Sequence, residues 1–288
     1  MMANKNRVAA QELVSRVHVE NAVIDGLHGP IPIRTYTPLS GEIRENLLWL
    51  HGGGFSHGGL DQLESHAVSA AIASVGVRVR AVEYRLVPPW NPLRDVKTSP
   101  LPGVRYPIPQ DDVMAAYFSF QDEHGRSVLG GASAGACHAA AAALRMRDEG
   151  ATGPTRLLLV YGTFHAALPP ASEELRERIR GIRGALQFSP KTVARMNYNY
   201  AGARDALHNP HVFPGAHDLT GLPPTFAMDA DRDSLRASGL AFSEELRAAG
   251  ALARYSVIPE TSHGFMDRPA SAGFREGAGQ MQAWLLGS

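Results

Sequence analysis

The chain of 288 residues is 44% hydrophobic and 19% charged, and its 28 basic and 28 acidic residues leave no formal net charge. This balance excludes the basic surface of a typical nucleic-acid-binding protein, and a single cysteine, Cys137, excludes an internal disulfide and a multi-cysteine metal site. No apolar run approaches the roughly 20 residues of a membrane span, and the polar segment Met1–Gln11 lacks the apolar stretch of a signal peptide. We therefore expect a cytoplasmic protein without a nucleic-acid partner, a membrane span, a metal or another cofactor.

Strand and helix patterns alternate along most of the chain, beginning with two strands that form a hairpin through Asp25–Gly29. The expected strands are Arg16–Ile24, Ile31–Tyr36, Leu47–Leu50, Val77–Glu83, Ser127–Gly130, Leu157–Tyr161, Thr225–Met228 and Ala253–Ile258. The expected helices are Asp61–Val75, with Asp61 as its N-cap, then Asp111–Gln121, Ala134–Glu149, Ser172–Arg183, Ser189–Tyr200, Ser234–Ala249 and a last helix within Ser271–Leu286. This alternation predicts an α/β fold with a mostly parallel sheet and helices on both faces.

The alternation is interrupted over residues 163–219, which are rich in proline, arginine and tyrosine. Apolar residues still recur there at helical spacing, as at Leu175, Ile179 and Ile182, so helices are favoured over a disordered linker. We predict one domain of residues 1–288 with a small helical cap inserted at about 163–219.

The segment Gly131-Ala132-Ser133-Ala134-Gly135 matches the pattern G-x-S-x-G between an expected strand and an expected helix. In a nucleophile elbow, a sharp strand-to-helix turn tolerates only small neighbours and exposes the serine hydroxyl above the sheet. A chain with 29 glycines could contain the pattern by chance, but its strand–turn–helix context favours Ser133 as a nucleophile.

The segment His51-Gly52-Gly53-Gly54-Phe55 directly follows the strand expected at Leu47–Leu50. Acyl transfer places negative charge on a carbonyl oxygen, and glycines let backbone N–H groups approach that oxygen closely. The spacing does not fit a dinucleotide-binding loop or a P-loop. It predicts half of an oxyanion hole, with the N–H of Ala134 as the other half.

Ser133 requires a base, and the chain has twelve histidines. His263 follows the strand expected at Ala253–Ile258 and precedes the last helix, so its loop lies where an imidazole could reach the end of the sheet. Other histidines that we expect to be packed or at the surface are His51, His66, His138, His165, His208, His211 and His217.

The acid must lie between the serine and the histidine in the chain, because that is the order in this type of hydrolase. Asp229, Asp231 and Asp233 all follow the strand expected at Thr225–Met228, so position alone does not separate them. Asp233 is favoured by its place at a turn into a helix, and the other two are expected to satisfy loop N–H groups.

From about Asn46 to its C-terminus, the sequence resembles the hormone-sensitive-lipase-like family of bacterial carboxylesterases. The motifs that carry the resemblance are His51-Gly52-Gly53-Gly54-Phe55, Glu83-Tyr84-Arg85-Leu86-Val87-Pro88, Pro109-Gln110-Asp111-Asp112-Val113, Gly131-Ala132-Ser133-Ala134-Gly135, Asp218-Leu219-Thr220-Gly221-Leu222-Pro223-Pro224, Asp233-Ser234-Leu235-Arg236 and His263-Gly264-Phe265. The resemblance implies an α/β-hydrolase fold and hydrolysis of small short-chain carboxylic esters through an acyl-serine intermediate. It also implies Asp233 as the acid and the amides of Gly53, Gly54 and Ala134 as the oxyanion hole, and it makes a homodimer plausible.

The sequence departs from the family pattern at three places. Ala132 and Ala136 replace the usual Asp and Gly beside the nucleophile, the N-terminal cap is shorter, and the segment Pro89–Val104 is longer. The side chains that we expect to contact the substrate are Phe55, Trp90, Phe164, Phe188, Tyr198 and Phe213.

Two alternative functions use the same residues. An amidase or a deacetylase of a specific metabolite would need the same triad, and the sequence does not exclude it. A non-catalytic ligand-binding protein on this fold would be expected to lose a member of the triad, whereas this chain keeps all three.

Overall fold

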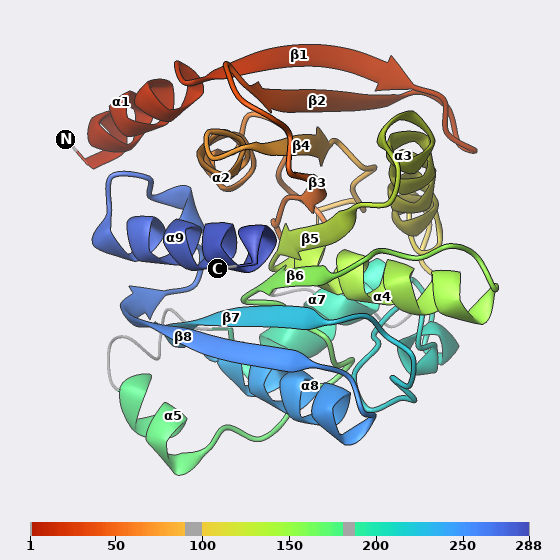
Figure 1. Cartoon of the computed structure of the whole chain (residues 1–288). Helices are drawn as coiled ribbons and strands as arrows, with labels where there is room; N and C mark the ends of the chain where they lie inside the picture. The colour runs from red at the N-terminus through yellow and green to blue at the C-terminus, as the bar shows by residue number, and fades with distance from the viewer. Residues whose placement is uncertain (1, 90–99, 181–187, 288) are drawn as a thin grey trace.

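The computed structural model describes residues 2–89, 100–180 and 188–287. The strands within these residues are β1 Val17–Ile24, β2 Ile31–Pro38, β3 Glu45–Leu50, β4 Val77–Val82, β5 Val128–Ala132, β6 Leu157–Val160, β7 Thr225–Arg232 and β8 Ala253–Ser262. They form one sheet in the order β1-β2-β4-β3-β5-β6-β7-β8 (Figure 1). The β1/β2 and β2/β4 pairs are antiparallel and the others are parallel, which confirms the predicted hairpin and the mostly parallel sheet.

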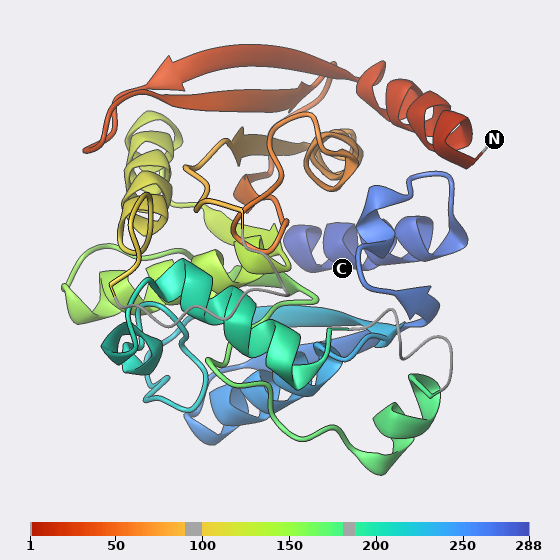
Figure 2. The same cartoon turned by 180° about the vertical axis from the view of Figure 1, so that it is seen from behind.

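Helices cover both faces of this sheet, as the two opposite views show (Figures 1 and 2). The helices within the described residues are α1 Met2–Val14, α2 Leu63–Ala73, α3 Ile108–His124, α4 Ala134–Asp148, α5 Glu173–Arg178, α7 Pro190–Ala201, α8 Arg236–Ala248 and α9 Ala272–Leu286, with the 3-10 helices η1 Asp205–His208 and η2 Phe265–Asp267. None of them is both long and apolar enough to cross a membrane.

The second half of strand β3, Leu47–Leu50, shows why the central strands contain continuous apolar runs. Leu47 and Trp49 point into the core formed with α1, α2 and α9, whereas Leu48 and Leu50 point into the core formed with α3, α4 and α8. Successive side chains of a strand face opposite sides, so a strand covered on both faces buries every residue.

The structure corrects some element boundaries. Helix α2 begins at Leu63 with Gln62 as its N-cap, and Asp61 instead forms an ion pair with Arg34 at 2.8 Å, so the predicted N-cap was wrong. The helix expected over Ser172–Arg183 ends at Arg178, and residues 181–187 lie outside the described part of the chain. The N-terminal helix α1 was not predicted; it packs on the core through Ala10, Leu13 and Val14.

Residues 163–219 contain α5, α7 and η1, in agreement with their helical spacing. Helix α7 packs over the glycine segment that follows β3, because Tyr200 stacks on Phe55 with ring centroids 4.2 Å apart. Figure 2 shows α7 crossing in front of the sheet, with α5 further out beside β7 and β8. That these helices form a cap stays a prediction.

Candidate active site

Ser133 lies in the turn between β5 and α4, where the backbone is strained. Its φ of +53° and ψ of −117° are unusual for a residue with a side chain. Its N–H donates to the carbonyl of Val160 at 2.8 Å, which fixes the turn to β6. A Cβ at Gly135 would lie 2.2 Å from the Leu50 carbonyl oxygen, and one at Gly131 would lie 2.5 Å from the Gly135 carbonyl carbon. The turn therefore requires the two glycines of the motif.

Ser133, His263 and Asp233 form one hydrogen-bonded chain at the carboxyl ends of β5, β8 and β7. The Ser133 hydroxyl lies 3.0 Å from His263 Nε2, to which it can donate. His263 Nδ1 lies 2.5 Å from Asp233 Oδ2, and the other oxygen of Asp233 accepts from the Leu235 N–H at 3.0 Å. The Asp233 side chain is fully buried and that of His263 is 20% exposed.

The electrostatic surroundings of His263 favour its protonated form. Burial alone would lower the pKa of His263, but the carboxyl groups of Asp233, Glu64 and Asp229 outweigh it, so the pKa is raised. An imidazole whose cation is stabilised in this way can accept a proton from the serine hydroxyl.

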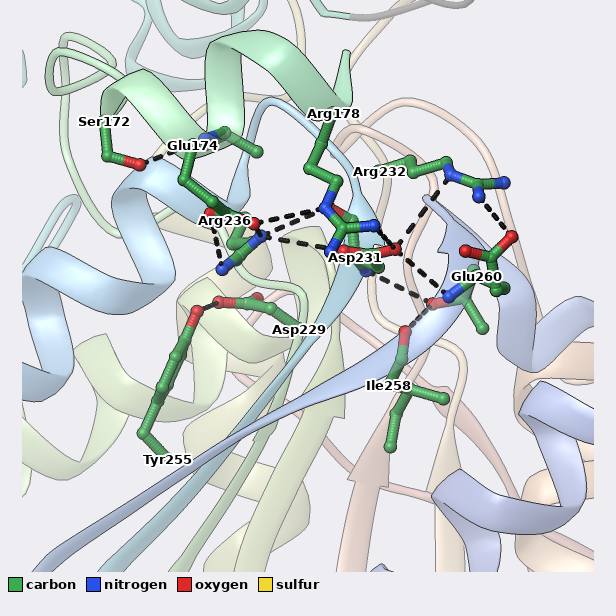
Figure 3. Close-up of polar contacts among 12 residues, drawn as sticks. Ser172, Glu174, Arg178, Asp229, Asp231, Arg232, Arg236, Tyr255, Ile258 and Glu260 are labelled. Atoms are coloured by element: carbon green, nitrogen blue, oxygen red, sulfur yellow. Dashed lines mark hydrogen bonds and ion pairs between the residues drawn. The ribbon is translucent and has the colours of Figure 1, made fainter.

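The other two aspartates at this end of the sheet face different partners (Figure 3). Asp229 accepts from the Tyr255 hydroxyl at 2.9 Å, and burial raises its pKa well above the usual range. Asp231 accepts from the Glu260 N–H at 3.1 Å. Among the three, Asp233 is the one whose carboxyl bonds to His263.

The glycine segment after β3 lies beside Ser133 and His263. Gly53 and Gly54 have φ values of +120° and +58°, and a Cβ at Gly53 would lie 2.0 Å from the His57 carbonyl oxygen. Both glycines line one cavity together with Ser133 and His263. Ala134 begins α4 directly after Ser133, so its N–H belongs to the positive end of that helix.

This cavity has a volume of about 430 Å³. Phe188 and Met196 form an apolar wall. Besides Ser133 and His263, the polar residues described as lining it are His57, Gln62, Glu64 and Asp267. Phe188 was among the expected substrate contacts, whereas Met196, His57, Gln62, Glu64 and Asp267 were not, because they lie outside the catalytic motifs.

The structure places only some of the aromatic residues that we expect to contact substrate along the cavity. Phe188 lines the cavity, with its ring centroid 5.0 Å from that of His263. Tyr198 is half-buried below the Arg204 guanidinium and is not among the described residues of the lining. Trp90 lies outside the described residues.

Three further aromatic candidates pack in the interior of the protein. None of them is among the residues described as lining the cavity. Phe55 and Phe213 cluster around Tyr200, and Phe164 stacks on Phe242 with centroids 4.3 Å apart. Their apolar surface is already buried against other rings, which spacing along the chain does not reveal.

Two of the remaining histidines are buried: His51 at the start of the glycine segment and His138 in α4. Burial lowers the pKa of His51 to about 4 and that of His138 to about 3, so both are neutral at neutral pH. His165 bonds to Ser238 and Glu245 instead. Within the described part of the chain, no group of three or more His, Cys, Asp or Glu side chains is arranged to hold a metal ion.

Known proteins resemble this chain over most of its length. A family model described as alpha/beta hydrolase fold matches residues 96–267. Esterase LipI of Mycobacterium tuberculosis is 31% identical over 89% of this chain and 77% of its own length. The Acetyl-hydrolase of Streptomyces hygroscopicus is 29% identical over 75% of this chain and 67% of its own length. An esterase from Pyrobaculum calidifontis superposes with a TM-score of 0.78 and 26% identity, covering 99% of this chain and 92% of that one.

Proposed function

The chain belongs to the alpha/beta hydrolase fold family, and we propose that it is a serine carboxylesterase that hydrolyses small, short-chain carboxylic esters. The observation that carries this proposal is the hydrogen-bonded chain from Ser133 through His263 to Asp233, which opens into the same cavity as Gly53 and Gly54. Relatives named as an esterase, a carboxylesterase and an acetyl-hydrolase support the same reaction.

The first step forms an acyl-enzyme. Ser133 Oγ attacks the ester carbonyl carbon while His263 Nε2 takes the hydroxyl proton. The carbonyl oxygen becomes negative in the tetrahedral intermediate and accepts hydrogen bonds from the amides of Gly53, Gly54 and Ala134. The carbon–oxygen bond to the alcohol then breaks, and the imidazolium of His263 returns its proton to the leaving oxygen.

The second step releases the acid. Water attacks the acyl carbon, His263 takes one water proton, and the carboxylic acid leaves as that proton returns to Ser133 Oγ. Asp233 keeps the imidazole in the tautomer with Nδ1 protonated and stabilises the imidazolium in both steps.

Four further features belong to the proposal. The cavity of about 430 Å³ and its apolar wall of Phe188 and Met196 suit a short acyl group. Because both residues come from the insertion at 163–219, we assign that insertion as a cap over the cavity. The proposal also includes a homodimer, on the basis of the family resemblance, and a cytoplasmic location, on the basis of the sequence.

The test uses a small acyl aryl ester and its matched amide. Ser133→Ala is expected to remove turnover and labelling by a fluorophosphonate probe while the thermal unfolding midpoint stays close to that of the unchanged protein. Full residual turnover in Ser133→Ala would rule out the acyl-serine mechanism, and faster hydrolysis of the amide would favour an amidase instead. Absence of both turnover and labelling in the unchanged protein would favour a ligand-binding protein.

A further inference from the structure

Glu64, in the first turn of α2, is a buried carboxyl group that the proposed mechanism does not use. It is only 2% exposed, and it is one of the residues that line the cavity that contains Ser133 and His263. Carboxyl groups are rarely buried to this extent unless polar partners compensate for the lost hydration. Its partners therefore indicate what it does.

Both oxygens of the Glu64 carboxyl group accept hydrogen bonds from residues outside α2. Oε1 accepts from the Gly52 N–H at 2.7 Å, directly before Gly53. Oε2 accepts from the hydroxyl of Tyr161. A Cβ at Gly52 would lie 2.4 Å from Oε1, so the carboxyl group reaches the glycine segment only because that residue has no side chain.

Tyr161 connects Glu64 with the base. It directly follows β6, its N–H donates to the Met228 carbonyl at 2.7 Å, and its φ of +37° places it in a strained conformation. Its ring packs against the His263 imidazole, with centroids 4.9 Å apart at 60°. The hydroxyl bond to Glu64 therefore fixes a ring that supports His263.

The backbone of Glu64 is tied to the same region. Its N–H donates to Asp267 Oδ1 at 2.8 Å, and Asp267 lies in η2, directly after the loop of His263. Its carbonyl accepts from Trp49 Nε1 at 3.0 Å, next to the end of β3. The start of α2 thus contacts both the segment that carries the glycines and the loop that carries the base.

We propose that Glu64 is a positioning residue that holds the oxyanion-hole amides and His263 at a fixed distance from each other. This proposal rests on the esterase function proposed above. Rate enhancement from an oxyanion hole depends on donors that are already in place when the charge develops, and a displacement of about 1 Å can cost a factor of 10². Glu64 acts through Gly52 and Tyr161 and does not touch the reacting atoms.

Charges around Glu64 and His263 allow a second readout. The Glu64 carboxyl group faces the Gly52 N–H, the Tyr161 hydroxyl, Asp267 and His263, and burial raises its pKa. The groups that face His263 are Asp233, Glu64, Asp229 and the rings of Tyr161 and Phe188. Negative charge on Glu64 raises the pKa of His263, so its removal lowers that pKa.

The experiment compares four variants by kcat, KM, pH profile and thermal unfolding, with the small acyl aryl ester as substrate. Glu64→Ala is expected to lower kcat on the order of 10²-fold with little change in KM, because the donors lose their alignment. Glu64→Gln keeps an acceptor for Gly52 and a partner for Tyr161, so it retains most of kcat and moves the acidic limb of the pH profile to lower pH. Tyr161→Phe lowers kcat less than Glu64→Ala. Ser65→Ala, the neighbouring buried residue of α2, leaves kcat unchanged.

A folded Glu64→Ala variant with the kcat of the unchanged protein overturns the proposal. So does a Glu64→Gln variant that is as slow as Glu64→Ala, because the carboxyl group would then act through its charge or its proton. If Glu64→Ala does not fold, the kcat values of Glu64→Gln and Tyr161→Phe decide whether Glu64 has the positioning role. An active protein that Ser133→Ala inactivates, but that tolerates the changes at Glu64, would keep the esterase function and remove only the positioning role.

Discussion

At the scale of single residues, the chemistry depends on how neighbours change the proton affinity of His263. Burial and the three carboxyl groups act in opposite directions on its pKa, and the carboxyl groups prevail. Because the base must be neutral to accept the serine proton, activity requires a pH above this raised pKa. His51 and His138, with pKa values lowered to about 4 and about 3 by burial, do not titrate in that range.

The acidic limb of kcat/KM against pH is therefore expected to have its midpoint above about 6.5, the ordinary value for histidine. Asp233→Asn removes the closest negative charge and, because its remaining oxygen faces the Leu235 N–H, places an amide donor against Nδ1. It therefore moves the midpoint to lower pH and lowers kcat by about 10⁴-fold. The measurement is kcat/KM on the aryl ester across the pH range. Asp231→Asn is the matched control, because its carboxyl group does not bond to His263; an equal loss in both variants would contradict the assignment of Asp233.

At the scale of elements, the short helix α5 is held in place by one buried side chain and by ion pairs with neighbouring segments. Six residues are too few for a stable helix without tertiary contacts, and Leu175 is the buried residue of this one. Figure 3 shows its anchors: Arg236 of α8 pairs with Glu174 at 3.0 Å, and Arg178 reaches Asp231 at 3.5 Å. Asp231 lies two residues before Asp233, so these pairs tie the insertion to the loop of the acid.

The two arginines of this cluster are expected to differ. Arg236→Met is expected to lower the free energy of unfolding by about 1–2 kcal/mol, because this half-buried side chain also donates to the Asp231 carbonyl at 3.3 Å. Arg178→Met is expected to cost less than about 1 kcal/mol, because its side chain is 48% exposed and its ion pairs are screened by solvent. Urea unfolding at low and high salt measures both, and equal losses would contradict this ranking.

At the scale of the whole molecule, contacts at the end of the sheet opposite the cavity connect distant parts of the chain. Arg156, just before β6, donates to the carbonyls of Trp284 at 2.5 Å and Leu285 at 2.8 Å, and it pairs with Glu45 at the start of β3. A cation at the C-terminus of a helix satisfies free carbonyls and complements the helix dipole. This arginine therefore fixes α9 to the central strands far from Ser133.

Arg156→Met is expected to separate stability from activity. It leaves the last carbonyls of α9 and the Glu45 carboxyl without this donor, so we expect a loss of about 1–3 kcal/mol in the free energy of unfolding. kcat at 25 °C should not change, because the cavity lies at the other end of the strands. Thermal unfolding and steady-state kinetics on the same sample test this, and a parallel loss of kcat would contradict it.

The sequence by itself determined the parts of the protein that depend on short segments. The elbow around Ser133 could be predicted because its constraint is local: a strained turn between a strand and a helix, in which Cβ atoms at Gly131 and Gly135 would collide with nearby backbone. The alternation of strands and helices follows equally from local periodicity. The same locality explains why the hairpin of β1 and β2 was predicted.

Only the tertiary structure decided which side chains meet across the sheet. Asp229, Asp231 and Asp233 lie within five residues of one another, and position along the chain did not separate them. The family resemblance implied Asp233, and the packing gives the physical reason, because its carboxyl group is the one of the three that bonds to His263. Phe55 was a reasonable candidate for the substrate pocket, but Tyr200, 145 residues further on, covers its ring. These contacts depend on how the elements pack, and a pattern within one element carries no information about a partner on another.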